Sequence, residues 1–327
     1  MRRRILGVGR RAASQPFVVG SHNIMDGLFL PAILSRYRQH QSGPHAMHAL
    51  CIQEVVSGAL SAIASTLGRR FVVASHVAEP RLGIVYDRTR LRLRELRVVS
   101  LPRLRHMPAW QRLYSRLEKK VALVGLFQRR GVGQRRWRGR VTVANFHLDT
   151  PGNNAHRAAQ LKALSNALDP QRHRPLVACG DTNCFEPNVM LAERDLAKIL
   201  APLARQHGAL DAHAIADPPA LQPTHFFARA NEPKIGHRIA VALGRVGFDW
   251  PTRYDVVAGP GQVVAAGTLD TPESDHNLVW AALRLPKKWP LRTPDARRRS
   301  ARIERAEEDL EDTVGSDWLT RLYKRLQ

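Results

Sequence analysis

The stretch LVACGDTNC at residues 176–184 decides the fold class. Its first four residues are all apolar and form a run of the length expected for a buried strand. Gly180 then leads into a turn. The turn carries Asp181 and Asn183, polar residues for which a strand has no structural use. In α/β sheets, ligands bind outside the carboxyl ends of the strands. The stretch therefore predicts a sheet whose strand ends carry functional side chains.

The same pattern of short runs rich in Val, Leu and Ile recurs along the chain, bounded by Gly, Pro or polar residues. The expected strands are 16–23, 49–55, 70–77, 82–88, 121–127, 141–148, 176–180, 254–258 and 277–285. The expected helices between them are 57–67, 154–168 and 188–203. The first helix has Ser57 at its start and Gly68 just past its end, as capping predicts. Strands separated by helices, with some hairpins, indicate a layered α/β domain.

Polar side chains follow most of these strands and would gather at one edge of the sheet. The candidate site residues are Asn23, Glu54, His147, Asp181, Asn183, Asp255, Asp275 and His276. Glu54, Asp181 and Asp275 cannot all stay ionised in a water-poor site without compensation, because like charges disfavour one another. A divalent cation is the natural compensator, and oxygen ligands suit Mg²⁺ or Mn²⁺ better than Zn²⁺. A metal held by one or two carboxylates is typical of phosphoryl chemistry.

The ordered series of motifs resembles the endonuclease/exonuclease/phosphatase superfamily, which includes DNase I-like nucleases, inositol polyphosphate 5-phosphatases and neutral sphingomyelinases. The motifs are Asn23, QEV at 53–55, HLD at 147–149, GDTN at 180–183, YD at 254–255 and SDH at 274–276, with Arg157 and Gln160 fitting an Arg-x-x-Gln pattern. The resemblance covers residues 17–285. It implies a four-layer α/β sandwich, two mixed β-sheets packed face to face with helices outside. It also implies hydrolysis of a phosphoester by Mg²⁺-assisted in-line attack of water.

The resemblance implies a role for each candidate residue. Glu54 is similar to the principal metal ligand of the family, with Asn23 and Asp275 beside it. Asp181 resembles the residue that orients or deprotonates the attacking water, and Asn183 the residue that binds the phosphate.

Two histidines complete the implied set. His276, paired with Asp255, and His147 would stabilise negative charge on the phosphoryl oxygens. An Asp that accepts from the far ring nitrogen fixes the tautomer of a His and favours the imidazolium. The chain departs from several family nucleases after the first motif. Met25 stands where they have a second acid, and Asp26 comes one position later.

The charge of the chain bears on its partners. Lys and Arg number 51 against 28 Asp and Glu, a formal net charge of +23. Such an excess predicts polyanionic partners such as nucleic acid, an anionic membrane surface or phosphorylated substrates. Residues 88–140 hold 17 Lys and Arg against two Glu, and we expect an apolar strand within flexible basic flanks there.

The expected organisation has three parts. Residues 1–15 form a basic N-terminal extension, 16–285 form the catalytic domain with a basic insertion at 88–140, and 286–327 form a Pro-broken linker and an amphipathic helix. The apolar face of that helix, with Trp318 and Leu322, packs on its own domain or docks a partner or membrane.

Three functions compete for this domain. The first is a nuclease or DNA-repair phosphodiesterase, whose basic segment neutralises backbone phosphates. The second is a lipid phosphodiesterase or phosphoinositide phosphatase that acts at an anionic membrane surface. The third is a catalytically silent binding module. The full set of polar residues argues against the third. Nucleic acid is favoured over lipid because the basic segment lacks long apolar loops suited to membrane insertion.

Cysteine use and hydropathy indicate the compartment. Cys51, Cys179 and Cys184 are too few for a disulfide scaffold and read as reduced thiols. No apolar run approaches the roughly 18 residues of a membrane span. Arg10 and Arg11 interrupt the N-terminal apolar run, so no signal peptide is expected. These features predict a soluble, cytoplasmic protein, and the sequence gives no indication of its oligomeric state.

Overall fold

The computed structural model describes residues 15–27, 29–104, 120–130, 137–150, 152–170, 173, 175–184, 189–216, 224, 254–272 and 274–286. The expected C-terminal helix, nearly all of the N-terminal extension and the middle of the basic segment lie outside these residues.

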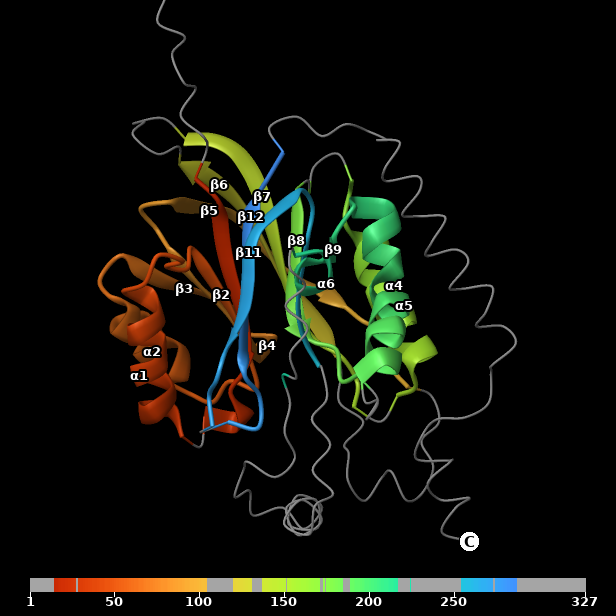
Figure 1. Cartoon of the computed structure of the whole chain (residues 1–327), viewed down its shortest axis with the longest axis horizontal. Coiled ribbons are helices and arrows are strands. Elements are labelled where there is room, and N and C mark those ends of the chain that lie inside the picture. The colour runs from red at the N-terminus through yellow and green to blue at the C-terminus, as the bar shows by residue number, and fades with distance from the viewer. Residues whose placement is uncertain are drawn as a thin grey trace, which may run out of the picture.

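Two six-stranded sheets form the centre of the fold (Figure 1). The first, sheet A, has the order β11 (Gln262–Leu269), β12 (Leu278–Arg284), β1 (Phe17–Asn23), β2 (Ala49–Gln53), β4 (Glu79–Asp87) and β3 (Phe71–His76). The second, sheet B, has the order β5 (Leu91–Ser100), β6 (Val121–Arg130), β7 (Trp137–His147), β8 (Leu176–Asp181), β10 (Asp255–Gly259) and β9 (Leu210–Asp211). Both sheets are mixed, because β1 pairs with β2 and β7 with β8 in parallel while the other pairs are antiparallel.

Helices cover the outer face of each sheet. α1 (Leu30–Gln41) and α2 (Ala59–Leu67) pack on sheet A, and α4 (Asn154–Ala167) and α5 (Val189–His207) pack on sheet B. Two short elements, η1 (Met25–Gly27) and α6 (Ala212–Ile215), lie in connections. The predicted four-layer α/β sandwich is confirmed. Among the described residues, no helix combines the length and the apolar character needed to cross a bilayer.

The core between the sheets is apolar but contains a buried polar link. Side chains such as Leu123, Ile84 and Val177 fill the space between the two inner faces. Within this space, Gln53 Nε2 donates to Asn145 Oδ1 at 2.6 Å, and Asn145 Nδ2 donates to the carbonyl oxygen of Ile52 at 2.9 Å. Both side chains are fully buried. An unmade hydrogen bond at such a position costs about 1–3 kcal/mol, so the pair fixes how the two sheets sit on each other.

Two local expectations were wrong. The basic segment does not consist of one apolar strand with flexible flanks, because β5 adds a second strand in which exposed Arg92 and Arg94 alternate with inward-facing Leu91 and Leu93. β5 forms with few apolar residues because it is an edge strand of sheet B and buries mainly one face. Ser57 does not cap α2, since Gly58 occupies the N-cap position with φ 82°, a conformation that glycine adopts without strain.

Gly180 lies where β8 passes β7, and a larger residue does not fit. A Cβ atom there would lie 2.0 Å from the carbonyl oxygen of Phe146, which is backbone and cannot swing away. We expect Gly180→Ala to destabilise the protein by at least about 1–3 kcal/mol, the usual cost of overpacking. Urea unfolding followed by circular dichroism measures this. Gly139→Ala is the control for loss of a glycine with positive φ, because no atom lies within 4 Å of the added Cβ. Equal stability of the two variants would contradict the prediction.

Candidate active site

Strand direction brings the predicted residues to one edge of the sandwich. The parallel neighbours β1 and β2 end there with Asn23 and, one residue past β2, Glu54. In sheet B the parallel neighbours β7 and β8 end there with His147 and Asp181. β10 and β12 run antiparallel to β8 and β1, so they begin at this edge. Their starts bring Asp255, Asp275 and His276 to the same place, which we call the catalytic edge.

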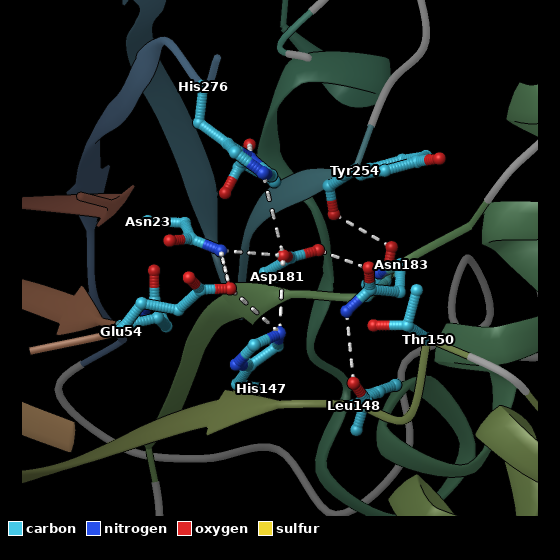
Figure 2. Close-up of polar contacts among 12 residues, drawn as sticks. Asn23, Glu54, His147, Leu148, Thr150, Asp181, Asn183, Tyr254 and His276 are labelled. Carbon is cyan, nitrogen blue, oxygen red and sulfur yellow. Dashed lines mark hydrogen bonds and ion pairs between the residues drawn. The ribbon is translucent and has the colours of Figure 1, made fainter. Parts of the chain in front are cut away.

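Asp181 is the centre of the cluster (Figure 2). Its Oδ2 accepts from Asn23 Nδ2 at 3.0 Å, and its Oδ1 accepts from the backbone N–H of Asn183 at 2.7 Å. Burial alone would raise the pKa of this carboxyl. His276, His147 and the two hydrogen bonds outweigh burial, so the pKa lies below its usual value. Asp181 is therefore an ionised carboxylate, oriented by donors from both sheets, at neutral pH.

His276 is held by Asp255 from behind. Its Nδ1 lies 2.7 Å from Asp255 Oδ2, and its Nε2 faces the cluster, 3.8 Å from Asp181 Oδ2 and 3.9 Å from Asp275 Oδ1. Burial disfavours the imidazolium, but these three carboxylates overcome it and raise the pKa of His276 well above its usual value. Burial raises the pKa of Asp255 to about 6 against the opposing effect of His276. We place the proton of the pair on the imidazole, because His276 faces three carboxylates.

His147 lies on the opposite side of Asp181. Its Nε2 is 3.6 Å from Asp181 Oδ2 and 3.7 Å from Glu54 Oε1. Burial, followed by repulsion from Lys120, lowers the pKa of His147 to about 3 despite the nearby Asp181. His147 is therefore a neutral ring at pH 7, and it can act on an oxygen only as a hydrogen-bond donor. The two site histidines thus differ in charge.

The ionised form of Glu54 is disfavoured by its surroundings. Burial, followed by repulsion from Asp275, raises its pKa although Asn23 Nδ2 donates to its Oε1 at 3.0 Å. Arg81 NH2 lies 3.7 Å from Glu54 Oε2 and 2.6 Å from Asp26 Oδ1. Arg81 and Asp26 were not among the predicted site residues. Asp26, which comes one position later than the second acid of several family nucleases, therefore binds Arg81 and keeps it beside Glu54.

The donor set fits a hard divalent cation. Two repelling carboxylates, Glu54 and Asp275, lie near an amide, and Mg²⁺ requires few protein ligands because it keeps several waters. Among the described residues, no group of three or more His, Cys, Asp or Glu side chains is placed to hold a metal ion. In this structure Asn23 offers its NH₂ group to the acids, while its Oδ1 accepts from the N–H of Met25 at 3.0 Å. The assignment of Asn23 as a metal ligand stays a prediction.

The backbone at the catalytic edge is strained. The four non-glycine residues with positive φ in the described chain are Met25, Asp26, Glu54 and Asn183, and all four lie in the loops that follow β1, β2 and β8. Such conformations cost of order 1–3 kcal/mol each and persist only where the surroundings hold them. Strain concentrated in this way is typical of a functional site.

Arg157 and Gln160 on α4 position the loop that follows β7. Gln160 accepts from the N–H of Asp149 and donates to its Oδ2 at 2.9 Å, and Arg157 Nε donates to the carbonyl oxygen of Asp149 at 3.1 Å. The next carbonyl toward the site, that of Leu148, accepts from Asn183 Nδ2 at 3.0 Å. The Arg-x-x-Gln pattern therefore supports the side of the site that carries Asn183.

Comparison by sequence finds no matching family model and no significant match among curated proteins. Comparison by structure finds many matches at low identity. An endonuclease/exonuclease/phosphatase family protein from Bacteroides thetaiotaomicron is 15% identical with a TM-score of 0.57, covering 82% of this chain and 97% of that chain. A mannosyl-6-phosphatase from B. thetaiotaomicron VPI-5482 is 15% identical with a TM-score of 0.56, covering 81% and 98%. D. rerio TDP2, solved with a single-strand DNA product, is 12% identical with a TM-score of 0.50, covering 81% and 97%. The chain has the endonuclease/exonuclease/phosphatase fold, as its sequence motifs predict.

Proposed function

We propose that this chain, whose fold is shared with metal-dependent phosphoesterases, is itself a metal-dependent phosphoesterase that hydrolyses a phosphodiester of nucleic acid. One observation carries the proposal. An ionised, oriented carboxylate, Asp181, lies within 3.8 Å of a charged histidine, His276, and shares its donor Asn23 with the partly buried acid Glu54. A site that holds a base, an acid and a metal-binding carboxylate together is suited to activating water against phosphorus.

Each residue has a task in this proposal. Asp181 accepts a proton from, or orients, the attacking water through Oδ2, the oxygen that faces both histidines. His276 presents a protonated Nε2 to the phosphoryl oxygens, where charge grows in the transition state. Neutral His147 adds a hydrogen bond. Asn183 places a backbone-anchored amide beside them.

Glu54, with Asp275 and Asn23, would hold the cation. When bound, Mg²⁺ would neutralise charge on the substrate phosphate and polarise its P–O bonds. The cation would also relieve the repulsion between Glu54 and Asp275 that raises the pKa of Glu54.

The net charge of +23 supports nucleic acid as the substrate. The observation that D. rerio TDP2 binds a single-strand DNA product on the same fold agrees with this choice. The three cysteines are buried free thiols, in keeping with the proposed cytoplasmic location.

A lipid phosphodiesterase is the second candidate, and one observation favours it. Three of the exposed large apolar side chains, Phe29, Val56 and Val77, lie at the catalytic edge, and Val77 is 91% exposed. Apolar side chains around a site of this kind suit acyl chains at a membrane surface. The silent binding module has the least support. His276 and Asp255 form a hydrogen-bonded pair in the site, and a protein without catalytic activity has no need of such a pair.

The test is hydrolysis, with Mg²⁺, of plasmid DNA, an abasic duplex, a 5′-tyrosyl oligonucleotide, a single-stranded RNA, sphingomyelin and inositol phosphates. We expect cleavage of at least one nucleic acid, abolished by EDTA and by Asp181→Asn. The control is Asp195→Asn on α5, which changes an acid outside the site. Cleavage of sphingomyelin alone would favour the second candidate. An activity retained by Asp181→Asn would contradict the site, and inactivity on every substrate would favour the binding module.

A further inference from the structure

A cluster of arginines lies at the end of the sandwich opposite the catalytic edge. Arg70 precedes β3, Arg90 follows β4 and Arg129 is near the end of β6. Strand register places them together, because Phe71 pairs with Asp87 and Leu91 pairs with Arg129. Figure 1 shows this end at the top of the view, where β1 begins, β6 ends and β7 begins.

Two of the three guanidinium groups, those of Arg70 and Arg90, share one carboxylate. Asp87 is 1% exposed, and its Oδ2 lies 3.2 Å from Arg70 Nε and 3.6 Å from Arg90 Nε. Arg90 also contacts the ring of His48, and Arg129 lies over the ring of Phe17 at 5.6 Å. The side chains of Arg70 and Arg90 keep 43% and 39% of their surface exposed. They therefore have donors left for a further anion, because a guanidinium has five N–H groups.

The pKa of the buried His48 ring is lowered by the positive charges around it. Burial, then Arg90, Arg129 and Arg70 in that order, lower the pKa of His48 to about 3. Three cations around one neutral ring and one carboxylate leave an excess of positive charge at this end of the fold.

Further arginines extend the cluster over the surface. Arg69 is adjacent to Arg70, and the N–H of Arg88 donates to the carbonyl oxygen of Arg70 at 2.9 Å. The N–H of Arg130 donates to the carbonyl oxygen of Arg90 at 2.8 Å. Arg69, Arg88 and Arg130 are all exposed. The arginine cluster, as we use the term, consists of Arg69, Arg70, Arg88, Arg90, Arg129 and Arg130.

The cluster is separate from the catalytic edge. His48 immediately precedes β2 and Glu54 immediately follows it, so a five-residue strand divides them. At about 3.3 Å per residue the separation is roughly 20 Å. This is the length of about six base pairs of duplex at about 3.4 Å each.

We infer that the arginine cluster is a second nucleic-acid-binding surface, which holds a sugar–phosphate backbone about six nucleotides away from the phosphate bound at the catalytic edge. The inference takes nucleic acid as the partner from the proposed function, but it requires none of the proposed chemistry. Half-exposed guanidinium groups in excess over carboxylates match phosphate geometry, since Arg binds phosphate bidentately.

An anionic membrane is the competing partner, and the surroundings of the cluster disfavour it. The exposed large apolar side chains in the described part of the chain are Phe29, Val56 and Val77 at the catalytic edge and Val264 on β11. β11 is the far edge strand of sheet A from β3 and β4. The cluster thus has no exposed large apolar side chain of its own among these residues, and membrane docking requires some apolar burial as well as charge.

The test is binding of a fluorescent 20-nucleotide single strand and a 20-base-pair duplex in EDTA, over a salt range, by the whole protein and by Arg69→Gln/Arg88→Gln. Each lost phosphate contact should reduce the slope of log K against log salt by about 0.9 for the duplex and about 0.7 for the single strand. We therefore expect a slope shallower by about twice these values and affinity weaker on the order of tenfold at low salt. A larger loss is expected for Arg69→Glu/Arg88→Glu, because it adds repulsion.

Lys162→Gln/Arg194→Gln is the matched control, since it removes two exposed cations from α4 and α5. Hydrolysis of bis(p-nitrophenyl) phosphate with Mg²⁺, which engages only the catalytic edge, should be the same in all variants. Unchanged oligonucleotide affinity in the Arg69 and Arg88 variants would overturn the inference. Binding to phosphatidylserine vesicles is measured with the same variants, and a loss confined to the vesicles would also overturn the inference. Weakened DNA binding in a protein without hydrolytic activity would support the surface while refuting the proposed function.

Discussion

His276→Ala should lower the rate of phosphodiester hydrolysis on the order of a thousandfold, which corresponds to about 4 kcal/mol of transition-state stabilisation. The substitution removes a cation that three carboxylates keep protonated and that faces the ionised Oδ2 of Asp181. Initial rates at saturating substrate measure the effect. The control is His213→Ala, which removes another buried histidine whose Nε2 bonds to the carbonyl oxygen of Gly267 at 3.1 Å. Equal rates in the two variants would show that His276 has only a structural role.

The pH dependence of the rate and of stability should follow the titration of the His276–Asp255 pair. The pKa of His276 is raised in the folded state, so its contribution to stability and to rate is complete below about pH 6.5. Both contributions are lost as pH rises through the folded pKa. Asp255→Asn removes the carboxylate that does most to raise this pKa, so the alkaline limb of the pH–rate profile should move to lower pH. A profile that does not move would contradict the assigned coupling.

Glu54→Gln should abolish metal-dependent hydrolysis, by on the order of a thousandfold, without lowering the thermal stability of the metal-free protein. Burial raises the pKa of Glu54, so its charged form opposes folding above the usual pKa of a Glu. A Gln side chain has no charge and keeps an amide oxygen that can accept from Asn23 Nδ2. The midpoint of unfolding in EDTA at pH 7 should be equal to or higher than in the wild type, and the difference should vanish below about pH 3.5, where Glu54 is protonated in both states.

Mg²⁺ should raise the unfolding midpoint of the wild type, because a ligand that binds only the folded state stabilises it. We expect that effect to be lost in Glu54→Gln and kept in Glu79→Gln, a change of an acid on β4. A Glu54→Gln protein that melts well below the wild type in EDTA would indicate a structural role for the carboxylate. Retained Mg²⁺ stabilisation would remove Glu54 from the metal site.

The candidate site was predictable because its residues are marked locally. Asp181 and Asn183 follow a short buried strand across a glycine, and Glu54 and His147 also stand at the ends of apolar runs. Parallel pairing then brings such residues together without further information. The apolar runs predicted most of the strands, since each predicted strand has an observed counterpart, and the family resemblance of the motif series implied the four-layer arrangement.

What the sequence could not predict depends on contacts between distant segments. Arg81 reaches Asp26 across 55 positions, and Gln53 meets Asn145 across 92, and neither pair has a local signal. β5 and β11 were missed because edge strands bury fewer apolar residues. The left-handed conformations of Glu54 and Asn183 were also invisible, because they follow from strain that the folded surroundings impose.

The division of the site between the two sheets has a consequence for synthesis of the chain. Asn23 is on the first strand, yet its sheet is completed by β12, which lies between β11 and β1 and begins beyond His276. A nascent chain therefore holds Glu54 and Asp181 long before it can place His276 opposite them. The ribosome must release almost the entire domain before the cluster can close. The proposed active site is thus incomplete until β12 has been synthesised.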